Sequence, residues 1–361
     1  MAKQKIGADS RLIEKIFDQL SSSVAIALLR DDKLTYEFYG GRNAALPGGA
    51  EENGKSGAEG VVKKRRLKQN DGGINRTTRF NIGSASALFT GALTVKLMEF
   101  DELRLNDPVS RFVPEFPAGD VTVYHLLTQS SGLSSETLPA PETLAAKREF
   151  YRSLYGSLVP AFPAGARCEY YQYNHAILAN LLERIAGQTL EELASVLLFM
   201  PLGMKYTTYN SASLRDNQFV IPWNHKDNRF MSELHAKQPT GQNGVYTTAL
   251  DLVRFGRMFI NGGEFDGKQV FLESSVEFIL REITGGRFMR TPLFMIKRKV
   301  DVFGCFSEKL SPDSVALTGN TGCILFIDPV KRAVGAALTN STWVDSVSQN
   351  YSNIIEILVT I

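Results

Sequence analysis

Ser84 stands at the head of an apolar run, NIGSASALFTG (residues 81–91), where its hydroxyl is placed to act as a nucleophile. A serine on a helix can be activated by a lysine three residues later, because side chains at i and i+3 are neighbours and a neutral amine accepts the hydroxyl proton. Position 87 holds alanine instead. The run therefore offers a nucleophile and leaves open which group takes its proton.

Several motifs that would place the chain in a common enzyme class are absent from the sequence. It contains no glycine-rich phosphate loop ending in Lys-Ser or Lys-Thr, no dinucleotide fingerprint and no HExxH. The GxSxG turn of ordinary triad hydrolases is missing too, because Ile82 stands where its first glycine belongs. A Ser-His-Asp enzyme is therefore disfavoured.

The elements that must position the serine begin near the N-terminus. Apolar residues at helical spacing predict a helix over 12–20. Two β-rich runs, 24–29 and 33–39, flank Asp31 and Asp32 and predict a hairpin. A helix followed by a two-stranded hairpin is thus expected ahead of the serine.

The remaining chain divides by composition and pattern. Residues 45–79 are rich in Gly, Glu, Asn and Lys, which predicts a loop or disordered insertion. Residues 80–187 have a mostly helical pattern, and from Gly244 onward we expect short strands and then a closing helix over 346–361. The insertion is either a solvated loop or a basic patch for an acidic partner, and the loop is favoured because no aromatic residues are interleaved. Its basic residues are Lys63, Lys64, Arg65, Arg66 and Lys68.

Composition limits the class of protein. A chain of 361 residues exceeds the size of one comfortable core, so two subdomains or one large unit with an inserted lobe are expected. The net charge of +2 provides no overall field for nucleic acid, and no stretch is apolar for long enough to cross a bilayer. The N-terminus lacks the apolar segment of a secretory signal, which favours a cytoplasmic location. The expected partner is a small-molecule substrate, and the oligomeric state is left open.

Cysteine usage points away from disulfides and metals. Cys168, Cys305 and Cys323 are odd in number and show no CxxC spacing. They are expected to be buried thiols. We expect neither a metal nor another cofactor.

Five segments resemble, in the same order, the class C β-lactamase and penicillin-binding-protein family, which also includes DD-peptidases, carboxylesterases and polyketide acyltransferases. The resemblance runs from Val24 to the C-terminus and treats 45–79 as an insertion. The segments are FNIGSASALFTGALTVKLMEFDELRLNDPVSRFVPEF, VTVYHLLTQSSGL, PAGARCEYYQYNHAILANLLERIAGQTLEEL, GVYTTALDLVRFGRMFINGGEFDGKQV and TGNTGCILFIDPVKRAVGAALTN.

The resemblance implies an α/β fold, with an antiparallel sheet built from both ends of the chain, flanking helices and an inserted, mostly helical lobe. The expected division is 1–80 and 241–361 for the two parts of the α/β domain, and 81–240 for the lobe. The pocket would lie where the lobe meets the sheet.

Transferred to this chain, the resemblance makes Ser84 the nucleophile and its backbone N–H one half of an oxyanion hole. The lysine of the family's SxxK motif falls on Ala87. The Tyr-x-Asn motif falls on Tyr170, Tyr171 and Gln172, so that the tyrosine is kept and the amide is one methylene longer.

The family's third motif, Lys-Thr-Gly or His-Thr-Gly, falls on Leu317, Thr318 and Gly319. Asn320 follows it and would supply the other oxyanion N–H, because backbone donors survive a change of side chain. Ala87, Gln172, Leu317, Thr318 and Gly319, with His175 beside them, are therefore the expected substrate-binding residues.

Two basic side chains are thus missing from the expected site. Loss of a positioned general base typically costs about 10²- to 10⁴-fold in rate. Loss of the second cation weakens recognition of a substrate carboxylate, so β-lactamase or DD-peptidase activity is not expected. Lys96 lies twelve residues along the same helix, roughly 18 Å away, and cannot replace the base. Tyr170 is the best remaining group, although with a pKa near its ordinary value of about 10 it acts as an acid rather than a base.

The histidines are weaker candidates. For His175 a structural role is favoured over a place in the pocket, and His125 is expected to be a buried, hydrogen-bonded histidine at a helix start. His225 and His235 lie in a loop-rich stretch from which they could reach over the expected site, but a functional role is the less favoured alternative for either.

Three hypotheses for function remain open. The first is a Ser84-dependent esterase or acyltransferase acting on a small ester or thioester, with Tyr170 as proton shuttle. The second is an isomerase, cyclase or lyase in which the same donors stabilise an enolate, and the third is a pseudoenzyme that binds a ligand. Ala87 is either natural, as the departures at Leu317 and Gln172 favour, or an engineered replacement of lysine. Ser84 as a simple helix cap and Tyr170 as a core aromatic are the structural alternatives.

Overall fold

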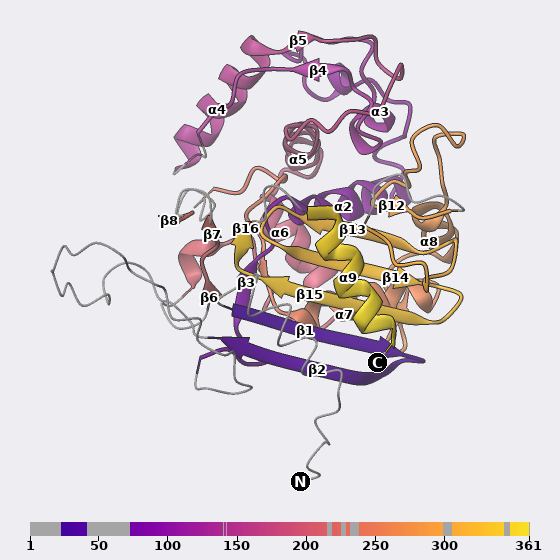
Figure 1. Ribbon diagram of the computed structural model, residues 1–361. Helices are drawn as coiled ribbons and strands as arrows, with labels where there is room; N and C mark the ends of the chain where they lie inside the picture. The colour runs from indigo at the N-terminus through magenta and orange to yellow at the C-terminus, as the bar shows by residue number, and fades with distance from the viewer. Residues whose placement is uncertain are drawn as a thin grey trace, which may run out of the picture.

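An antiparallel sheet of six strands, in the order β12-β13-β14-β15-β1-β2, joins the two ends of the chain (Figure 1). The computed structural model describes residues 23–41, 73–139, 141, 143–214, 219–224, 229–231, 238–298, 305–342 and 347–360. The strands of this sheet are β1 (Ser23–Arg30), β2 (Lys33–Gly41), β12 (Met295–Ile296), β13 (Val315–Gly319), β14 (Cys323–Asp328) and β15 (Ala333–Thr339).

The expected hairpin at the start of the sheet is confirmed. β1 pairs with β2 on one side and with β15 on the other, where Val24 lies opposite Thr339. Asp31 and Asp32 form the turn with positive φ angles of 45° and 64°, the left-handed backbone that suits a tight hairpin. Seven of the eight residues of β1 are buried, because both faces of the sheet are covered.

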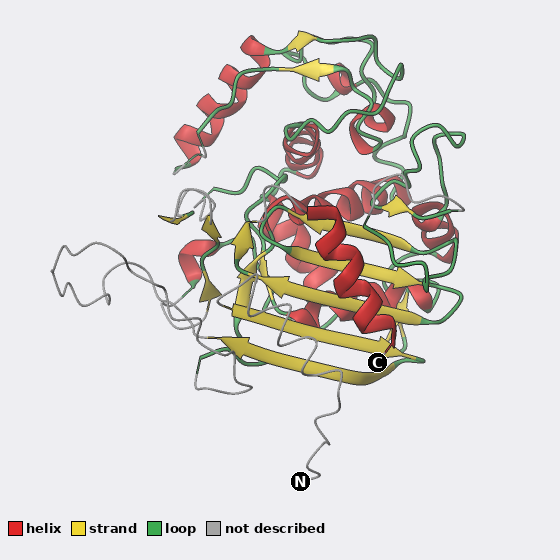
Figure 2. Cartoon of the chain, in the orientation of Figure 1, coloured by secondary structure: helices red, strands yellow, loops and turns green. Residues whose placement is uncertain are grey.

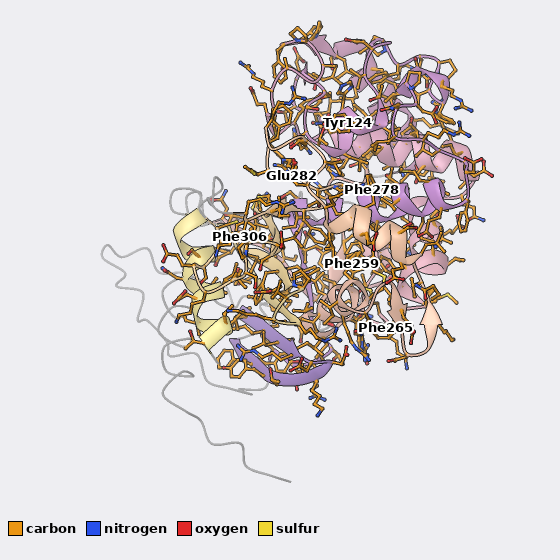
Figure 3. All side chains as sticks on the ribbon, turned by 90° about the vertical axis from the view of Figure 1, so that its right-hand side faces the viewer. Tyr124, Phe259, Phe265, Phe278, Glu282 and Phe306 are labelled. Atoms are coloured by element: carbon orange, nitrogen blue, oxygen red, sulfur yellow. The ribbon has the colours of Figure 1, made fainter. Side chains whose placement is uncertain are left out.

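Helices cover both faces of the sheet (Figure 2). α9 (Val347–Thr360) lies across one face, where Ile354, Ile355 and Leu358 share a core with Val24 and other residues of the strands. α7 (Ala249–Ile260) packs against β1, β14 and β15 from the other side. Phe259 of α7, near the centre of Figure 3, is surrounded by the rings of Phe255, Phe271 and Phe294.

The expectation that strands replace helices after Gly244 is wrong for two segments, α7 and α8 (Glu273–Leu280). The Thr248 side chain accepts a hydrogen bond from the backbone N–H of Asp251 and so caps α7. Leu252, Phe255 and Phe259 then recur at helical spacing and are buried. The later strands and the closing helix agree with the prediction.

Helices lie above the sheet in Figure 1, where α2 runs between the sheet and α3, α4 and α5. α2 is buried along most of its length and contacts both α5 and α6. The helices of this part of the chain are α2 (Ala87–Glu99), α3 (Val123–Leu127), α4 (Leu144–Ser157), α5 (Asn174–Ala186) and α6 (Leu190–Ala194). Short helical turns are η1 (Gly83–Ser86), η2 (Val109–Arg111), η3 (Ser195–Phe199) and η4 (Ser211–Ser213).

Small sheets fix the loops around these helices. β3 (Arg79–Asn81) lies between β6 (Phe219–Val220) and β9 (Tyr246–Thr247), which anchors the chain immediately before η1. The other short pairs are β4 (Leu133–Ser134) with β5 (Val159–Pro160), β10 (Glu264–Phe265) with β11 (Lys268–Gln269), and β7 (Trp223–Asn224) with β8 (Arg229–Phe230) and β16 (Ser341–Thr342).

Some predictions fall outside the described residues, namely the helix over 12–20, the basic cluster of the insertion, His225 and His235. Among the helices that the structure does describe, none is both long and apolar enough to span a bilayer.

Candidate active site

Ser84 lies in η1, directly after β3, and meets Asn320 at the end of β13. Two hydrogen bonds join these residues in opposite directions. The Asn320 N–H donates to Ser84 Oγ at 3.3 Å, and the Ser84 N–H donates to Asn320 Oδ1 at 3.2 Å. Neither η1 nor α2 receives a side-chain cap, so the simple capping role for Ser84 is not the one observed.

Gly319 allows β13 to approach η1 this closely. A Cβ atom at position 319 would lie 2.2 Å from the carbonyl oxygen of Ile82, well inside van der Waals contact. Only glycine removes that clash. Close packing therefore requires glycine at position 319, whether or not position 317 carries a cation.

The Tyr170 hydroxyl lies beside Ser84, close enough for the serine side chain to lower its pKa. The side chain is 60% exposed and so is not a core aromatic. Partial burial of the hydroxyl raises its pKa above the ordinary value of 10, and the Ser84 side chain and the positive charge of Arg290 act in the opposite direction. The pKa of Tyr170 is therefore higher than the ordinary value expected from the sequence. The phenol is neutral at physiological pH.

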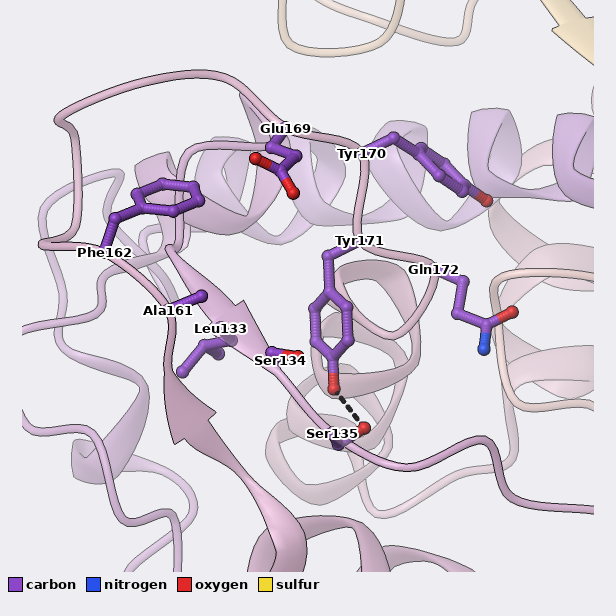
Figure 4. Close-up of a pocket in the computed structure, with 9 residues that line it drawn as sticks. All are labelled: Leu133, Ser134, Ser135, Ala161, Phe162, Glu169, Tyr170, Tyr171 and Gln172. Atoms are coloured by element: carbon purple, nitrogen blue, oxygen red, sulfur yellow. Dashed lines mark hydrogen bonds between the residues drawn. The ribbon is translucent and has the colours of Figure 1, made fainter.

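Tyr171, the next residue, turns the other way (Figure 4). Its hydroxyl donates to Ser135 Oγ at 2.6 Å, and its ring points down in this view, whereas the Tyr170 and Gln172 side chains point to the right. A cavity of about 330 Å³ lies here. It is lined by Leu133, Ser134, Ser135, Ala161, Phe162, Glu169, Tyr170, Tyr171 and Gln172. Gln172 therefore borders a cavity that Tyr170 also lines, and its substrate-binding role stays a prediction.

Gln129, which the sequence analysis did not select, holds the chain on both sides of Tyr170. Its carbonyl oxygen accepts from the Glu169 N–H at 2.9 Å, and its Oε1 accepts from the Tyr171 N–H at 3.0 Å. Oε1 also accepts from Asn174 Nδ2. Gln129 is buried and has a left-handed φ of 57°, an unfavourable backbone that persists only where surrounding contacts hold it.

His175, at the start of α5, is buried and bonded through Nδ1 to Gln129 Nε2 at 3.2 Å. Because Gln129 Oε1 already accepts from two donors, Nε2 must be the donor in this bond and Nδ1 must be unprotonated. Burial, assisted by the nearby charge of Arg290, lowers the pKa of His175 to about 3. The structural role favoured from the sequence is the one that these contacts describe.

The other predicted positions lie around the same turn. Ala87 is the first residue of α2 and is partly exposed. Leu317 and Thr318 are half-buried on β13, and Leu317 packs against the main core. Lys96 lies at the far end of α2, where it donates to the Val270 carbonyl and pairs with Glu99, so it cannot serve Ser84.

Arg290 is a cation that the sequence did not reveal. Its Nε donates to Cys168 Sγ at 3.2 Å, two residues before Tyr170. The expectation of a site without a nearby cation is therefore wrong. Cys168 itself is only partly buried, whereas Cys305 and Cys323 are buried as expected.

His125 is hydrogen-bonded at the start of α3, as predicted, but it is half-buried rather than buried. Its Nδ1 accepts from the Thr122 N–H at 3.1 Å, which completes a capping box. A second contact joins this region to the segment that carries Arg290. Tyr124 donates to the Ile283 carbonyl at 3.4 Å.

Within the described ranges, no group of three or more His, Cys, Asp or Glu side chains lies close enough together to hold a metal ion. The site consists instead of a serine, a tyrosine and backbone N–H groups.

The family model for beta-lactamase matches residues 11–356. The chain therefore belongs to the beta-lactamase family, a family of serine hydrolases that shares this mixed α/β fold.

Individual relatives are distant. The penicillin-binding protein PbpX of Bacillus subtilis is 24% identical over 246 residues, which are 63% of this chain and 60% of that protein. The chain thus aligns with less than two thirds of that relative. Among solved structures, EstCE1, a hydrolase with promiscuous acyltransferase activity, has a TM-score of 0.74 at 14% identity and 97% coverage of both chains. The D-alanine carboxypeptidase AmpC of Burkholderia cenocepacia has a TM-score of 0.72 at 21% identity and 98% coverage of both chains. These similarities confirm the expected fold.

Proposed function

We propose that the protein is a Ser84-dependent esterase or acyltransferase that acts on a small ester or thioester. The observation that carries the proposal is the meeting of three groups at one point. The Ser84 hydroxyl lies 3.3 Å from the backbone nitrogen of Asn320 and beside the hydroxyl of Tyr170. A nucleophile, a proton carrier and an oxyanion donor are the parts that acyl transfer requires.

The proposed acylation step uses Tyr170 in its neutral form. Ser84 Oγ attacks the carbonyl carbon, and its proton passes to the Tyr170 oxygen while Tyr170 gives its own proton to the departing alkoxide or thiolate. One C–O bond forms, the bond to the leaving group breaks, and Tyr170 ends the step neutral. The N–H groups of Ser84 and Asn320 stabilise the oxyanion between these events. Water or an alcohol then takes the acyl group by the reverse path.

β-Lactam or peptide substrates do not suit this site. Alanine at position 87 supplies no amine beside Ser84, and leucine at position 317 supplies no cation on β13. Esters and thioesters have better leaving groups than amides, so they depend less on a strong general base. The solved hydrolase EstCE1, whose acyltransferase activity is described as promiscuous, supports this reaction class by fold similarity.

The test is covalent labelling with a fluorophosphonate, followed by intact mass measurement. Ser84 Oγ should form a bond to phosphorus with loss of fluoride, giving one adduct per chain. Ser84→Ala should abolish the adduct, and Tyr170→Phe should slow its formation by about 10²-fold, the lower range for loss of a proton-transfer group. Absence of any adduct on the unmodified protein would refute the proposal.

The raised pKa of Tyr170 favours a second candidate, a non-hydrolytic enzyme in which Tyr170 is a general acid and the backbone donors hold an enolate. This reaction needs no acyl-serine. It predicts that Ser84→Ala keeps most of the turnover and that Tyr170→Phe removes it. Loss of turnover in Ser84→Ala with turnover kept in Tyr170→Phe would contradict this candidate and favour the esterase.

A further inference from the structure

The backbone donor of Ser84 is already occupied in this structure. Its N–H, one of the two oxyanion donors of the proposed function, donates to the side-chain Oδ1 of Asn320 at 3.2 Å. A substrate carbonyl oxygen needs the same N–H. Substrate and the Asn320 carboxamide therefore compete for one donor.

The carboxamide of Asn320 fits closely against the turn that carries Ser84. A Cβ atom at Gly83, which has a φ of +53°, would lie 2.2 Å from Asn320 Oδ1. Glycine at position 83 thus leaves room for the carboxamide as well as adopting the left-handed backbone. The Asn320 carboxamide therefore lies against Gly83 as well as against the Ser84 N–H.

The side chain of Asn320 can move while its backbone stays in place. Asn320 is exposed to solvent at the end of β13, so rotation of its side chain meets no core. The backbone turn is closed by the Gly322 N–H donating to the Gly319 carbonyl at 3.0 Å. Rotation would uncover the Ser84 N–H and leave the Asn320 N–H where it is.

We propose that the Asn320 side chain is a gate on the oxyanion site. In the closed form its Oδ1 accepts the Ser84 N–H, and in the open form it turns into solvent and exposes both donors. This inference rests on the proposed acyl-transfer function. An amide oxygen is a better acceptor than an ester oxygen, whereas a charged oxyanion forms a stronger bond than either. The gate therefore opens for the charged transition state rather than for the bound ester.

Two substitutions at position 320 separate gating from a structural role. Asn320→Ala removes the carboxamide and keeps the backbone N–H, so fluorophosphonate labelling of Ser84 should become about 3- to 10-fold faster, the factor for one net hydrogen bond. Asn320→Asp keeps the acceptor and adds a negative charge beside the oxyanion, so labelling should become at least about tenfold slower. A merely structural role would slow both variants.

Asn210→Ala is the matched control, because Asn210 is an exposed asparagine whose side chain lies outside the site. It should label at the rate of the unmodified protein. Labelling of Asn320→Ala that is no faster than this control would overturn the gate and leave the esterase proposal intact.

A second measurement tests the gate proposal even if no variant reacts with the fluorophosphonate. Hydrogen exchange of the Ser84 amide, followed by NMR, should speed up in Asn320→Ala because the N–H loses its acceptor. The Ala85 amide donates to the Ile82 carbonyl at 3.1 Å and should keep its exchange rate, which verifies that η1 is intact. Unchanged exchange at Ser84 would refute the gate. Absence of labelling in every variant would refute only the proposed function.

Discussion

Gln129 is bonded to the backbone on both sides of Tyr170. Rotation of the Tyr170 backbone would break either the bond to the Glu169 N–H or the bond to the Tyr171 N–H. The left-handed backbone of Gln129 is therefore maintained by contacts that also aim the phenol at Ser84. Orientation of the tyrosine here depends on a buried amide rather than on a neighbouring lysine.

Gln129→Met should slow fluorophosphonate labelling of Ser84 by about 10- to 100-fold, because it keeps the side-chain length and removes the Oε1 bond to the Tyr171 N–H, while the backbone bond to the Glu169 N–H remains. The measurement is the second-order labelling rate, with Thr128→Val as control. Thr128 is a buried neighbour whose hydroxyl bonds to Tyr124 and Ser130 and not to the tyrosine segment.

The effect of Gln129→Met should vanish when Tyr170 is already phenylalanine, because the two residues then act on the same step. Equal slowing by Gln129→Met in both backgrounds would show that Gln129 does not act through Tyr170.

Ala87→Lys should raise the labelling rate by about 10²-fold, because it places an amine one turn from Ser84. The rate should increase with pH, since only the neutral amine accepts a proton. Ala87→Met supplies similar bulk without the amine and should leave the rate near that of the unmodified protein. Equal rates for the lysine and methionine variants would mean that position 87 does not face the serine hydroxyl.

Gly319→Ala should lower the free energy of unfolding by about 1–3 kcal/mol, because its Cβ would meet the Ile82 carbonyl and force β13 away from η1. Urea denaturation measures the change. Gly156→Ala is the control, since no atom lies within 4 Å of its added Cβ in α4, and it should be slightly stabilising. If both variants unfold at the same urea concentration, the close approach of β13 and η1 is not as described.

His175 should make the protein less stable in acid. The folded state keeps it neutral down to about pH 3, while the unfolded chain protonates it near its ordinary value of 6.5. The unfolded state therefore binds more protons between these pH values, and the free energy of unfolding falls as pH is lowered through this range, by at most about 5 kcal/mol. His175→Gln should show a shallower fall in chemical denaturation between pH 7 and pH 4. An identical fall in both proteins would contradict the assigned pKa.

Local motifs allowed much of the site to be predicted. GSAS, YYQ and LTGN each lie within one short segment, and their order along the chain was enough to select Ser84, Tyr170 and Asn320. The structure brings these three together, and their catalytic roles remain predictions. The hairpin at Asp31 and Asp32 was predictable for the same reason, because turn residues and alternating strands act over a few residues.

Helix α7 and the residues that support Tyr170 were missed for physical reasons. The strand-rich runs after Gly244 masked a capped amphipathic helix whose apolar side faces the sheet. Arg290 reaches Cys168 across 122 positions of sequence, and no spacing rule connects residues so far apart. Gln129 showed no signal of its own, since its importance comes from contacts that exist only after α3 and the 169–171 segment have met.

The sequence by itself determined the family, the antiparallel sheet with its flanking helices, and the loss of two basic side chains, because these depend on residue types and local patterns. Only the tertiary structure decided that Asn320 covers the Ser84 N–H, that Gln129 orients Tyr170 and that Arg290 supplies a nearby charge. These relationships join residues up to 236 positions apart. Side-chain rotamers and close packing across elements set them, and neither is encoded in the spacing of any one segment.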